Sequence, residues 1–599
     1  MKKINLILVV LFALFCIVPN SSADPADNTN VVSETESEEE ITVSFPEWVD
    51  EDMLDDNYIG RIMPSKTRLR ATRLSGLSLS EPNRSLYMAM KKRISKVAAG
   101  EETSTIFTVP ASEVFSPYVF TAEDLGVSSI DSGSGTSITA ESAAAFSAVL
   151  DPQLEALDFT AVMQCLMNDC PYELYWFNKS YTVPTQDFRR GAYRNKETGL
   201  FDRLVIIGNF IVTLHVSQDY AKRTSNEGTV TYSRNEIDPV YGLSVQAAAE
   251  NAAEILDRYA GMSDYEKLCG YRDEICGLAS YNYAAVTENW PYGDPWQLIW
   301  VFDGKPNTQV VCEGYAKAFQ YLAGLSTKDA IVITVQGRIP EGVHMWNVVT
   351  IDGFNYLTDL TNQDAGYDLF MKGSTDGALD TGYYINNGYG TTKYTYNEGL
   401  GWSDEELTLS SVDYIVRKAA VEKVPEIQVS SDTIYPGYAA AVRLTDEDPE
   451  FPASAILLYT VIEGQETVQE IEMEDGIGFL SVAGEYYFTV IRDGIESPAT
   501  EPVTITTAVL PEGAAFTLPA GSLIQSEAFA GDESIAMVIA TDCTFDSGAF
   551  SDAGVEFAVL SGDCSFEQGS FDSSLVLGLD EDFDWVDGYR FVVRDTTAE

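Results

Sequence analysis

The sequence predicts a multidomain chain, in which a mixed α+β domain is followed by an antiparallel β-sandwich and a short repeat solenoid. Three observations predict this order. Residues 81–415 combine apolar residues at helical spacing with runs that alternate like strands. Residues 424–508 contain short strand-like runs separated by turn residues. Residues 509–599 repeat one pattern every 21 residues, which is typical of stacked repeats.

The chain begins like a secreted protein. Two lysines precede an apolar run over residues 4–18, and small residues follow up to Ala23. This order predicts a signal peptide, residues 1–23, and a mature protein that is extracellular or held at the cell surface. A membrane anchor is the alternative, but the run is short for a spanning helix. Residues 24–80 are predicted to form an acidic, largely disordered leader, because they are rich in Asp, Glu and Ser.

The composition is strongly acidic. The chain contains 37 lysines and arginines against 92 acidic residues, which gives a net charge of −55. Such a charge repels nucleic acid and anionic lipid, so neither is predicted as a partner. Solubility is a sufficient reason for the charge. No second long apolar run follows the signal peptide, so no membrane span is predicted after its cleavage.

Residues 309–364 contain the main functional signal. Cys312 precedes apolar residues at helical spacing, so it is expected to open a helix. Free N–H groups and the helix dipole at that position stabilise a thiolate, which is the nucleophilic form of cysteine. The alternative is that Cys312 is a small buried core residue, which is the commoner role of a free cysteine.

A predicted β-hairpin follows this helix. His344 begins a strand-like run, Asp352-Gly353 is a strong signal for a two-residue turn, and residues 354–360 form the return strand. The turn fixes a register in which His344 and Asp359 are diagonal neighbours on one face, about 7–8 Å apart at the backbone. An imidazole and a carboxylate can meet across that separation.

Thiol chemistry requires this kind of pairing, because a base must share the thiol proton and a third group must orient the base. The chain contains two histidines, His215 and His344. His215 lies in a predicted strand and is expected to be structural, with a competing role as an alternative base.

Three segments together resemble the transglutaminase-like superfamily, in the form found in many secreted bacterial proteins. The segments are VCEGYAKAFQYL, HMWNVVTIDG and YLTDLT. The resemblance implies a papain-like α+β catalytic domain over residues 81–415, with its core in 245–415. In that domain Cys312 is the nucleophile, His344 the base and Asp359 the orienting acid. No cofactor and no metal ligand is expected.

Less is predicted about the surroundings of this site. The backbone N–H of Cys312 is one expected oxyanion donor, and Gln309, Tyr283 and Trp296 are candidates for the second. The aromatic segment 172–180 is interpreted as an edge that could line a groove.

The remaining α+β sequence divides into helix-like and strand-like runs. Cys269 and Cys276 are seven residues apart on one predicted helix, too far for a disulfide, and they are expected to pack in the core rather than bind zinc. A disulfide between Cys165 and Cys170 remains an alternative. Helices are predicted over 85–100, 143–170, 245–260 and 264–283, and strands over 201–216 and 228–233.

The two C-terminal modules have different signals. Residues 424–508 predict a sandwich of immunoglobulin-like size without a cysteine pair, for which a spacer role is favoured over ligand binding. In residues 509–599, Phe529, Phe550 and Phe571 share one repeat position, as do two cysteines at another position. This motif resembles the leucine-rich repeats of bacterial surface proteins of the BspA type.

The sequence therefore favours a secreted cysteine-dependent enzyme that acts on amide bonds of proteins or peptides through an acyl-thioester. Hydrolysis is favoured over cross-linking, because water is the default acceptor and the sequence shows no feature that guides an amine. The alternative is a non-enzymatic surface adhesin, whose C-terminal modules bind host or cell-wall ligands and whose transglutaminase-like fold is a scaffold. The substitution Cys312→Ala separates them, because it abolishes turnover in the first case and spares ligand binding in the second.

Overall fold

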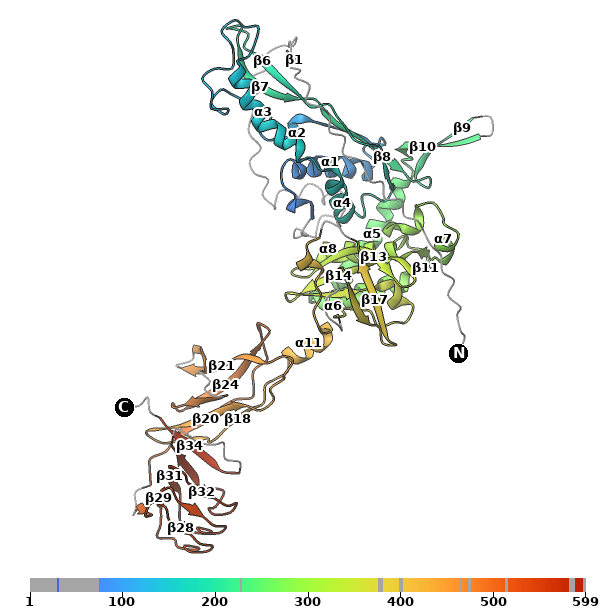
Figure 1. The fold of residues 1–599 in the computed structure, drawn as a ribbon. Helices are drawn as coiled ribbons and strands as arrows, with labels where there is room; N and C mark the ends of the chain where they lie inside the picture. Colours follow the sequence, from blue (N-terminus) through green and yellow to red (C-terminus); the bar gives the residue numbers. More distant parts are fainter. Residues whose placement is uncertain are drawn as a thin grey trace. The chain divides into compact units, whose positions relative to one another are not determined.

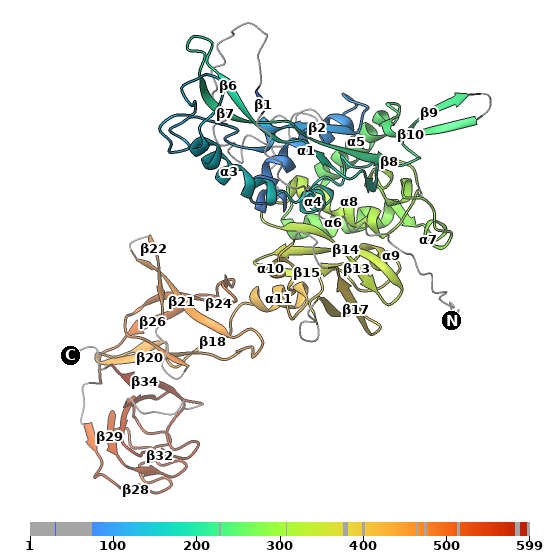
Figure 2. The same cartoon turned by 45° about the horizontal axis from the view of Figure 1, so that its top comes forward.

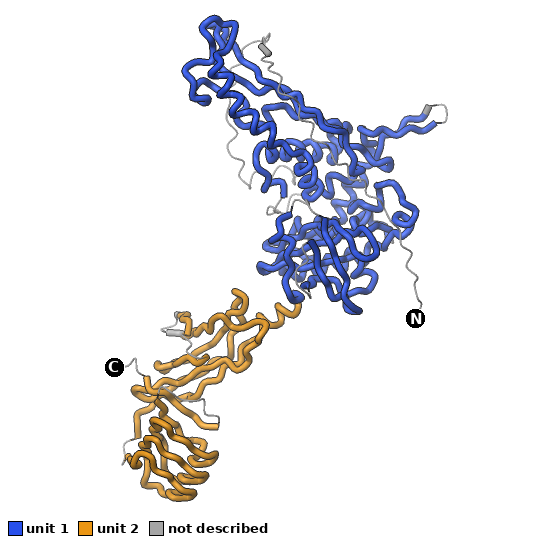
Figure 3. The backbone as a smooth tube through the Cα atoms, in the orientation of Figure 1, with its two compact units in different colours: residues 1–414 blue, residues 415–599 orange. Residues whose placement is uncertain are grey.

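The computed structural model describes a mixed helix-and-sheet chain in two compact units, residues 1–414 and 415–599 (Figure 3). This confirms the coarse prediction of a multidomain α+β protein. The predicted signal peptide and nearly all of the leader lie outside the described residues. Described are residues 30–31, 75–226, 229–306, 308–374, 381–397, 402–462, 465–471, 476–511, 515–580 and 588–595.

Among the described residues, the first part of unit 1 contains four α-helices beside three small sheets (Figure 1). The strands pair in the orders β1-β6-β7-β3, β2-β8-β4 with β5 beside β8, and β10-β9. The helices are α1 (Asn83–Ala98), α2 (Ala111–Val114), α3 (Ala140–Glu155) and α4 (Phe159–Asp169). The strands are β1 (Asn30–Val31), β2 (Ile106–Pro110), β3 (Val119–Phe120), β4 (Phe177–Tyr181), β5 (Thr185–Gln186), β6 (Arg189–Arg194), β7 (Phe201–Ile207), β8 (Asn209–Val216), β9 (Ala221–Asn226) and β10 (Thr229–Ile237).

Two of the predicted elements in this part are divided. The predicted helix over 143–170 is two helices, because the side chain of Asp158 caps α4 by accepting two backbone N–H groups. The predicted strand over 201–216 breaks at Gly208, which has φ of +107°. A Cβ at Gly208 would lie 2.4 Å from the carbonyl oxygen of Asp187, so the bend requires glycine.

The aromatic segment 172–180 belongs to the core of unit 1. Tyr175, Trp176 and Phe177 are at most 3% exposed. The interpretation of this segment as a groove edge is wrong, because its rings pack inward and the apolar area that they bury stabilises the fold.

The second part of unit 1 is built on a five-stranded antiparallel sheet of order β15-β14-β13-β17-β16. Helix α8 packs on β13 and β14, and helices α6 and α9 contact α8 (Figure 2). The helices are α5 (Tyr241–Tyr259), α6 (Asp264–Leu278), α7 (Tyr283–Thr287), α8 (Cys312–Ser326), α9 (Leu360–Asp364) and α10 (Asp404–Leu407). The strands are β11 (Ala279–Tyr281), β12 (Thr308–Val310), β13 (Ile331–Ile339), β14 (Gly342–Ile351), β15 (Phe354–Thr358), β16 (Gly382–Asn386) and β17 (Thr391–Tyr396).

Both faces of this sheet are covered. Val349 and Tyr356 pack with Phe319 of α8 in the core that runs through unit 1. The neighbouring Val348 and Leu357 belong to a second apolar cluster, which also contains Trp346, Tyr383 and Tyr394. Successive side chains of a strand point to opposite faces, so the two clusters lie on the two sides of the sheet. The strands that carry the candidate site are therefore held from both sides.

Unit 2 joins the two predicted C-terminal modules in one compact unit. One sheet has the order β19-β26-β24-β21-β22, with β25 beside β24; its pairs are antiparallel except β19 with β26, which is parallel. A second sheet, β18-β20-β34-β33-β31-β29-β27, continues from antiparallel strands into parallel strands of the repeats, with β23 beside β20. Helix α11 (Tyr414–Val421) begins at the unit boundary. The strands are β18 (Ile427–Val429), β19 (Thr433–Ile434), β20 (Tyr438–Leu444), β21 (Ala453–Ile462), β22 (Gln465–Glu470), β23 (Ile477–Leu480), β24 (Gly484–Arg492), β25 (Ile495–Glu496), β26 (Val503–Thr507), β27 (Ala515–Thr517), β28 (Leu523–Ile524), β29 (Met537–Thr541), β30 (Thr544–Phe545), β31 (Phe557–Ser561), β32 (Ser565–Phe566), β33 (Val576–Leu579) and β34 (Arg590–Arg594).

The 21-residue period places equivalent residues directly over one another. Strands β28, β30 and β32 pair in parallel with equivalent residues as partners. The rings of Phe529, Phe550 and Phe571 stack, with centroid separations of 4.9 Å and 5.2 Å along the row. The backbone N–H of Cys543 donates to the sulfur of Cys564, and both thiols are free. The repeats therefore form a stacked array.

The middle ring of this row is expected to stabilise unit 2 strongly. Phe550 is 1% exposed, so Phe550→Ala removes a ring from between two others and leaves a cavity. We expect a loss of about 3–5 kcal/mol in the free energy of unfolding of unit 2. The loss is measured by urea titration, with hydrogen exchange in peptides of the repeats as the readout. Phe479→Ala is the matched control, since Phe479 is 43% exposed in the same unit; equal losses in the two variants would contradict the packing argument.

Candidate active site

Cys312 is the first residue of helix α8, as the sequence predicts. The chain enters the helix from β12, which pairs in parallel with β11, and the backbone N–H of Val311 bonds the carbonyl of Pro295 at 2.8 Å. Gly314 permits this entry, because a Cβ there would lie 2.8 Å from Cβ of Val310. Cys312 is half-buried and unbridged. Its sulfur therefore stands at the positive end of the helix, as thiolate chemistry requires.

The hairpin that carries His344 has the predicted register. Asp352 and Gly353 adopt positive φ angles of 51° and 80°, and the predicted pairing holds from this turn to the end of the return strand. That strand ends at Thr358, however, and not at residue 360. The side chain of Asp359 accepts a backbone N–H of the next turn and caps α9 instead.

His344 and Asp359 meet despite this early end of the strand. Nε2 of His344 lies 2.8 Å from Oδ2 of Asp359. The histidine is 5% exposed and the aspartate is completely buried. The side-chain nitrogen of Asn362 lies 3.5 Å from the same ring nitrogen, so Nδ1 is left free, and the Cys312 side chain is near enough to the ring to raise the pKa of His344. The structure thus brings the three predicted site residues together from α8, β14 and the start of α9.

The opposite charges of His344 and Asp359 stabilise each other. Burial lowers the pKa of His344, but the Asp359 carboxylate, and to a lesser degree the Cys312 side chain, raise it to about 10. Burial likewise opposes ionisation of Asp359, yet the imidazolium of His344 and two further donors hold the pKa of its carboxyl below the usual value. His344 is therefore charged at neutral pH and remains so until the pH rises through about 10.

Two donors at Asp359 were not predicted from the sequence. The hydroxyl of Tyr394 donates to Oδ2 of Asp359 at 2.8 Å, and the side-chain amide of Asn362 donates to the same oxygen at 2.7 Å. The ring of Trp346 stacks on His344 at a centroid distance of 6.3 Å. Asn362 follows Asp359 by three residues, a spacing that is visible in the sequence. Tyr394 comes from β17 and has no local sequence signal.

An ion cluster around the buried Glu313 holds the first turn of α8. Glu313 bonds Lys179 of β4 at 2.8 Å and Lys317 at 2.9 Å, and it also accepts the hydroxyl of Tyr292. Burial opposes ionisation of Glu313, but the two ammonium groups hold its pKa at about 2. The residue after the candidate nucleophile is therefore a fixed anchor.

The remaining predicted residues lie around this centre in different settings. Gln309 is exposed on β12, Tyr283 is 69% exposed at the start of α7, and Trp296 packs on Tyr292. None of these contacts identifies a second oxyanion donor. His215 lies on β8, where Ser180 Oγ is 3.1 Å from its Nδ1 and burial lowers its pKa.

The described residues also bear on disulfides, metal binding and membrane helices. The seven described cysteines are all free, including Cys165 and Cys170. Cys269 and Cys276 lie on α6, and no group of three His, Cys, Asp or Glu side chains in the described ranges is arranged to hold a metal. Within those ranges, no helix has both the length and the apolar character needed to cross a membrane.

Comparison with known proteins adds no relative. No family model matches the chain, and no curated protein matches it either. Function is therefore inferred from the geometry of Cys312, His344 and Asp359.

The two histidines permit a direct test of the buried pair. In an NMR titration we expect His344 to keep its charged form up to about pH 10, while His215 titrates below 6.5. Asp359→Asn should bring the His344 transition down by several pH units, because burial then dominates. His215 is the internal control and should not change. A His344 transition near 6.5 in the unaltered protein would show that the ion pair does not form.

Proposed function

We propose that unit 1 is a cysteine-dependent enzyme that acts on amide bonds of proteins or peptides through an acyl-thioester. One observation carries this proposal. A buried imidazole is held by a carboxylate at 2.8 Å and lies near enough to a cysteine that opens a helix for that side chain to raise the pKa of the imidazole. Nucleophile, base and orienting acid in this order form the arrangement that acyl transfer by a thiol requires.

In the proposed reaction, the Cys312 thiolate bonds to the carbonyl carbon of the substrate amide, and the carbonyl oxygen takes the negative charge. The backbone N–H of Cys312 is the proposed donor to this oxygen. The carbon–nitrogen bond then breaks, and the departing amine takes the proton from Nδ1 of His344. A thioester on Cys312 and a free amine result.

Water completes the proposed cycle. It gives a proton to His344, and its oxygen bonds to the thioester carbon, so that the carbon–sulfur bond breaks. A carboxylic acid is released, and the pair of thiolate and imidazolium is restored. Asp359 keeps the ring oriented and stabilises its positive charge at each step. We favour water over an amine as the acceptor, so the proposed activity is that of a peptidase or deamidase.

The proposal also assigns a fold type to each part of the chain. A cysteine helix packed on an antiparallel sheet that carries the histidine supports a transglutaminase-like fold for unit 1. For unit 2, two sheets of short strands support an immunoglobulin-like sandwich, and parallel strands at a 21-residue period support BspA-type leucine-rich repeats. We propose a secreted protein in which the sandwich of unit 2 is a spacer.

Thiol alkylation tests whether the site is assembled. Because His344 is charged at neutral pH, we expect Cys312 to react with iodoacetamide at pH 6, and His344→Ala to slow this reaction by about tenfold or more. Peptide mass spectrometry identifies the modified cysteine.

The same experiment contains its own controls. Cys269 and Cys276 are also half-buried, but burial raises the pKa of both thiols, that of Cys276 to about 12. They should not react at pH 6. If Cys312 reacts no faster than these two, or reacts equally without His344, the proposed enzyme loses its physical basis.

A second experiment identifies the acceptor. We expect the mature chain, incubated with casein and dansylcadaverine, to release new carboxyl groups faster than it attaches the dansyl amine. The rate should fall as the pH rises through about 10, because His344 then loses the proton that the leaving amine needs. Cys312→Ala is the blank. Dansyl attachment as the main product would instead establish cross-linking.

A further inference from the structure

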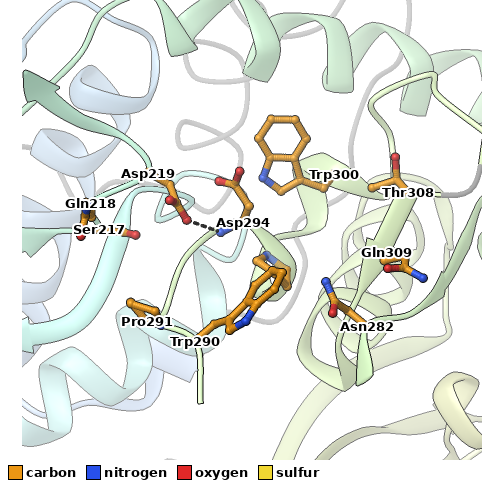
Figure 4. Close-up of a pocket in the computed structure, with 11 residues that line it drawn as sticks. Ser217, Gln218, Asp219, Asn282, Trp290, Pro291, Asp294, Trp300, Thr308 and Gln309 are labelled. Carbon is orange, nitrogen blue, oxygen red and sulfur yellow. Dashed lines mark hydrogen bonds between the residues drawn. The ribbon is translucent and has the colours of Figure 1, made fainter. Parts of the chain in front are cut away.

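A cavity of about 660 Å³ opens in unit 1 beside the strand that leads into Cys312 (Figure 4). Small-ligand sites commonly have volumes of about 300–1,000 Å³. Asp219 and Asp294 lie on one side of the cavity, and Asn282, Thr308 and Gln309 lie on the other. The cavity is therefore shared by the first part of unit 1 and by the segments next to the candidate active site.

The two carboxylates give the cavity a negative charge. The backbone N–H of Asp294 donates to Oδ2 of Asp219 at 3.0 Å, which holds the two residues together. Burial and the Asp219 carboxylate raise the pKa of Asp294 to about 6. Oδ1 of Asp294 is buried, and the side chains of Tyr220 and Trp300 near this carboxylate lower its pKa only in part. A positively charged group in the cavity would relieve the repulsion between the two carboxylates.

Two indole rings, Trp290 and Trp300, also line the cavity. The face of an indole attracts a cation within about 6 Å. The ring of Trp300 already shows this preference, because the ammonium of Lys305 lies 5.8 Å from its centroid. Lys305 pairs with Asp303, and its side chain is 72% exposed, so it extends into solvent. Acidic oxygens and aromatic faces in one cavity match the chemistry of an alkylammonium group.

The position of the cavity relates it to the reaction. Gln309 lines the cavity and precedes Cys312 by three residues, which is about 10 Å of extended chain. Asn282 also lines it and follows Tyr281, which is a strand partner of Val310 and interacts with Cys312. A peptide whose amide lies at Cys312 can therefore reach the cavity with a side chain two or three residues away.

We infer that this cavity is a specificity subsite for a basic side chain, lysine above all, of the peptide substrate. The inference rests on the proposed function of Cys312 for its link to catalysis. The ammonium group lies between Asp219 and Asp294, and its aliphatic stem packs against the indole rings. Substrates with a lysine close to the reacting amide are then preferred over neutral ones.

The test measures binding in the Cys312→Ala protein, so that it does not depend on turnover. The probes are the blocked peptide acetyl-Ala-Ala-Lys-Ala-amide and its norleucine counterpart, which has the same stem without the charge. Isothermal titration gives Kd for each. We expect the lysine peptide to bind about tenfold tighter than the norleucine peptide, and Asp294→Asn and Asp219→Asn each to remove about this advantage. Asp273→Asn is the matched control, because Asp273 is exposed on α6 and its substitution changes the net charge by the same amount.

Each outcome bears on the inference. Equal binding of the two peptides, or an advantage for lysine that survives both substitutions at the cavity, overturns it. Binding of cadaverine as tight as that of the lysine peptide supports the subsite and assigns it to a free amine. Thermal unfolding of each variant shows whether it is folded. If Cys312 proves unreactive while lysine binding holds, the proposed reaction fails and the binding site stands; the reverse result removes the subsite alone.

Discussion

The buried pair of His344 and Asp359 is the interaction on which the arrangement of unit 1 depends. Taking an imidazolium and a carboxylate out of water costs several kcal/mol for each ion, and their attraction offsets this only when the other oxygen lone pairs are satisfied. Asp359 meets this condition through Tyr394 and Asn362. Three separate segments, the hairpin of β14 and β15, the start of α9, and β17, must converge for the pair to be stable. The sheet order places β17 beside β13 and so supplies the third donor.

The sequence predicts the part of this site that local rules determine. The turn at Asp352-Gly353 fixes the hairpin register, and the apolar spacing after Cys312 fixes the start of α8. Both follow from residues close together in the chain. Tyr394 is 35 residues from Asp359, and its role depends on a strand pairing that periodicity does not indicate. The return strand stops early because Asp359 accepts a backbone N–H group, which outweighs the strand propensity of the residues that follow.

In the first part of unit 1, too, local sequence rules do not predict contacts between distant residues. Its aromatic segment has the composition of a ligand-binding edge, yet burial of Trp176 and its neighbours makes it core. Composition alone does not separate these cases, because a large ring contributes equally to a core and to a groove. The cavity beside β12 also has no local sequence signal. Asp219 and Asp294 are 75 residues apart and become neighbours only through tertiary packing.

These contacts also determine how much chain the site needs. A catalytic core that begins at residue 245 lacks Lys179, which neutralises the buried Glu313 in the first turn of α8. It also lacks the carbonyl of Asn168, which accepts a buried hydrogen bond from Gln320 in the same helix. Without Lys179, Glu313 keeps Lys317 as its one ion-pair partner among the described residues, and one apolar core runs through both parts of unit 1. The first part is therefore a structural half of unit 1, because it contributes contacts that hold helix α8 and supplies Asp219 to the wall of the cavity beside β12.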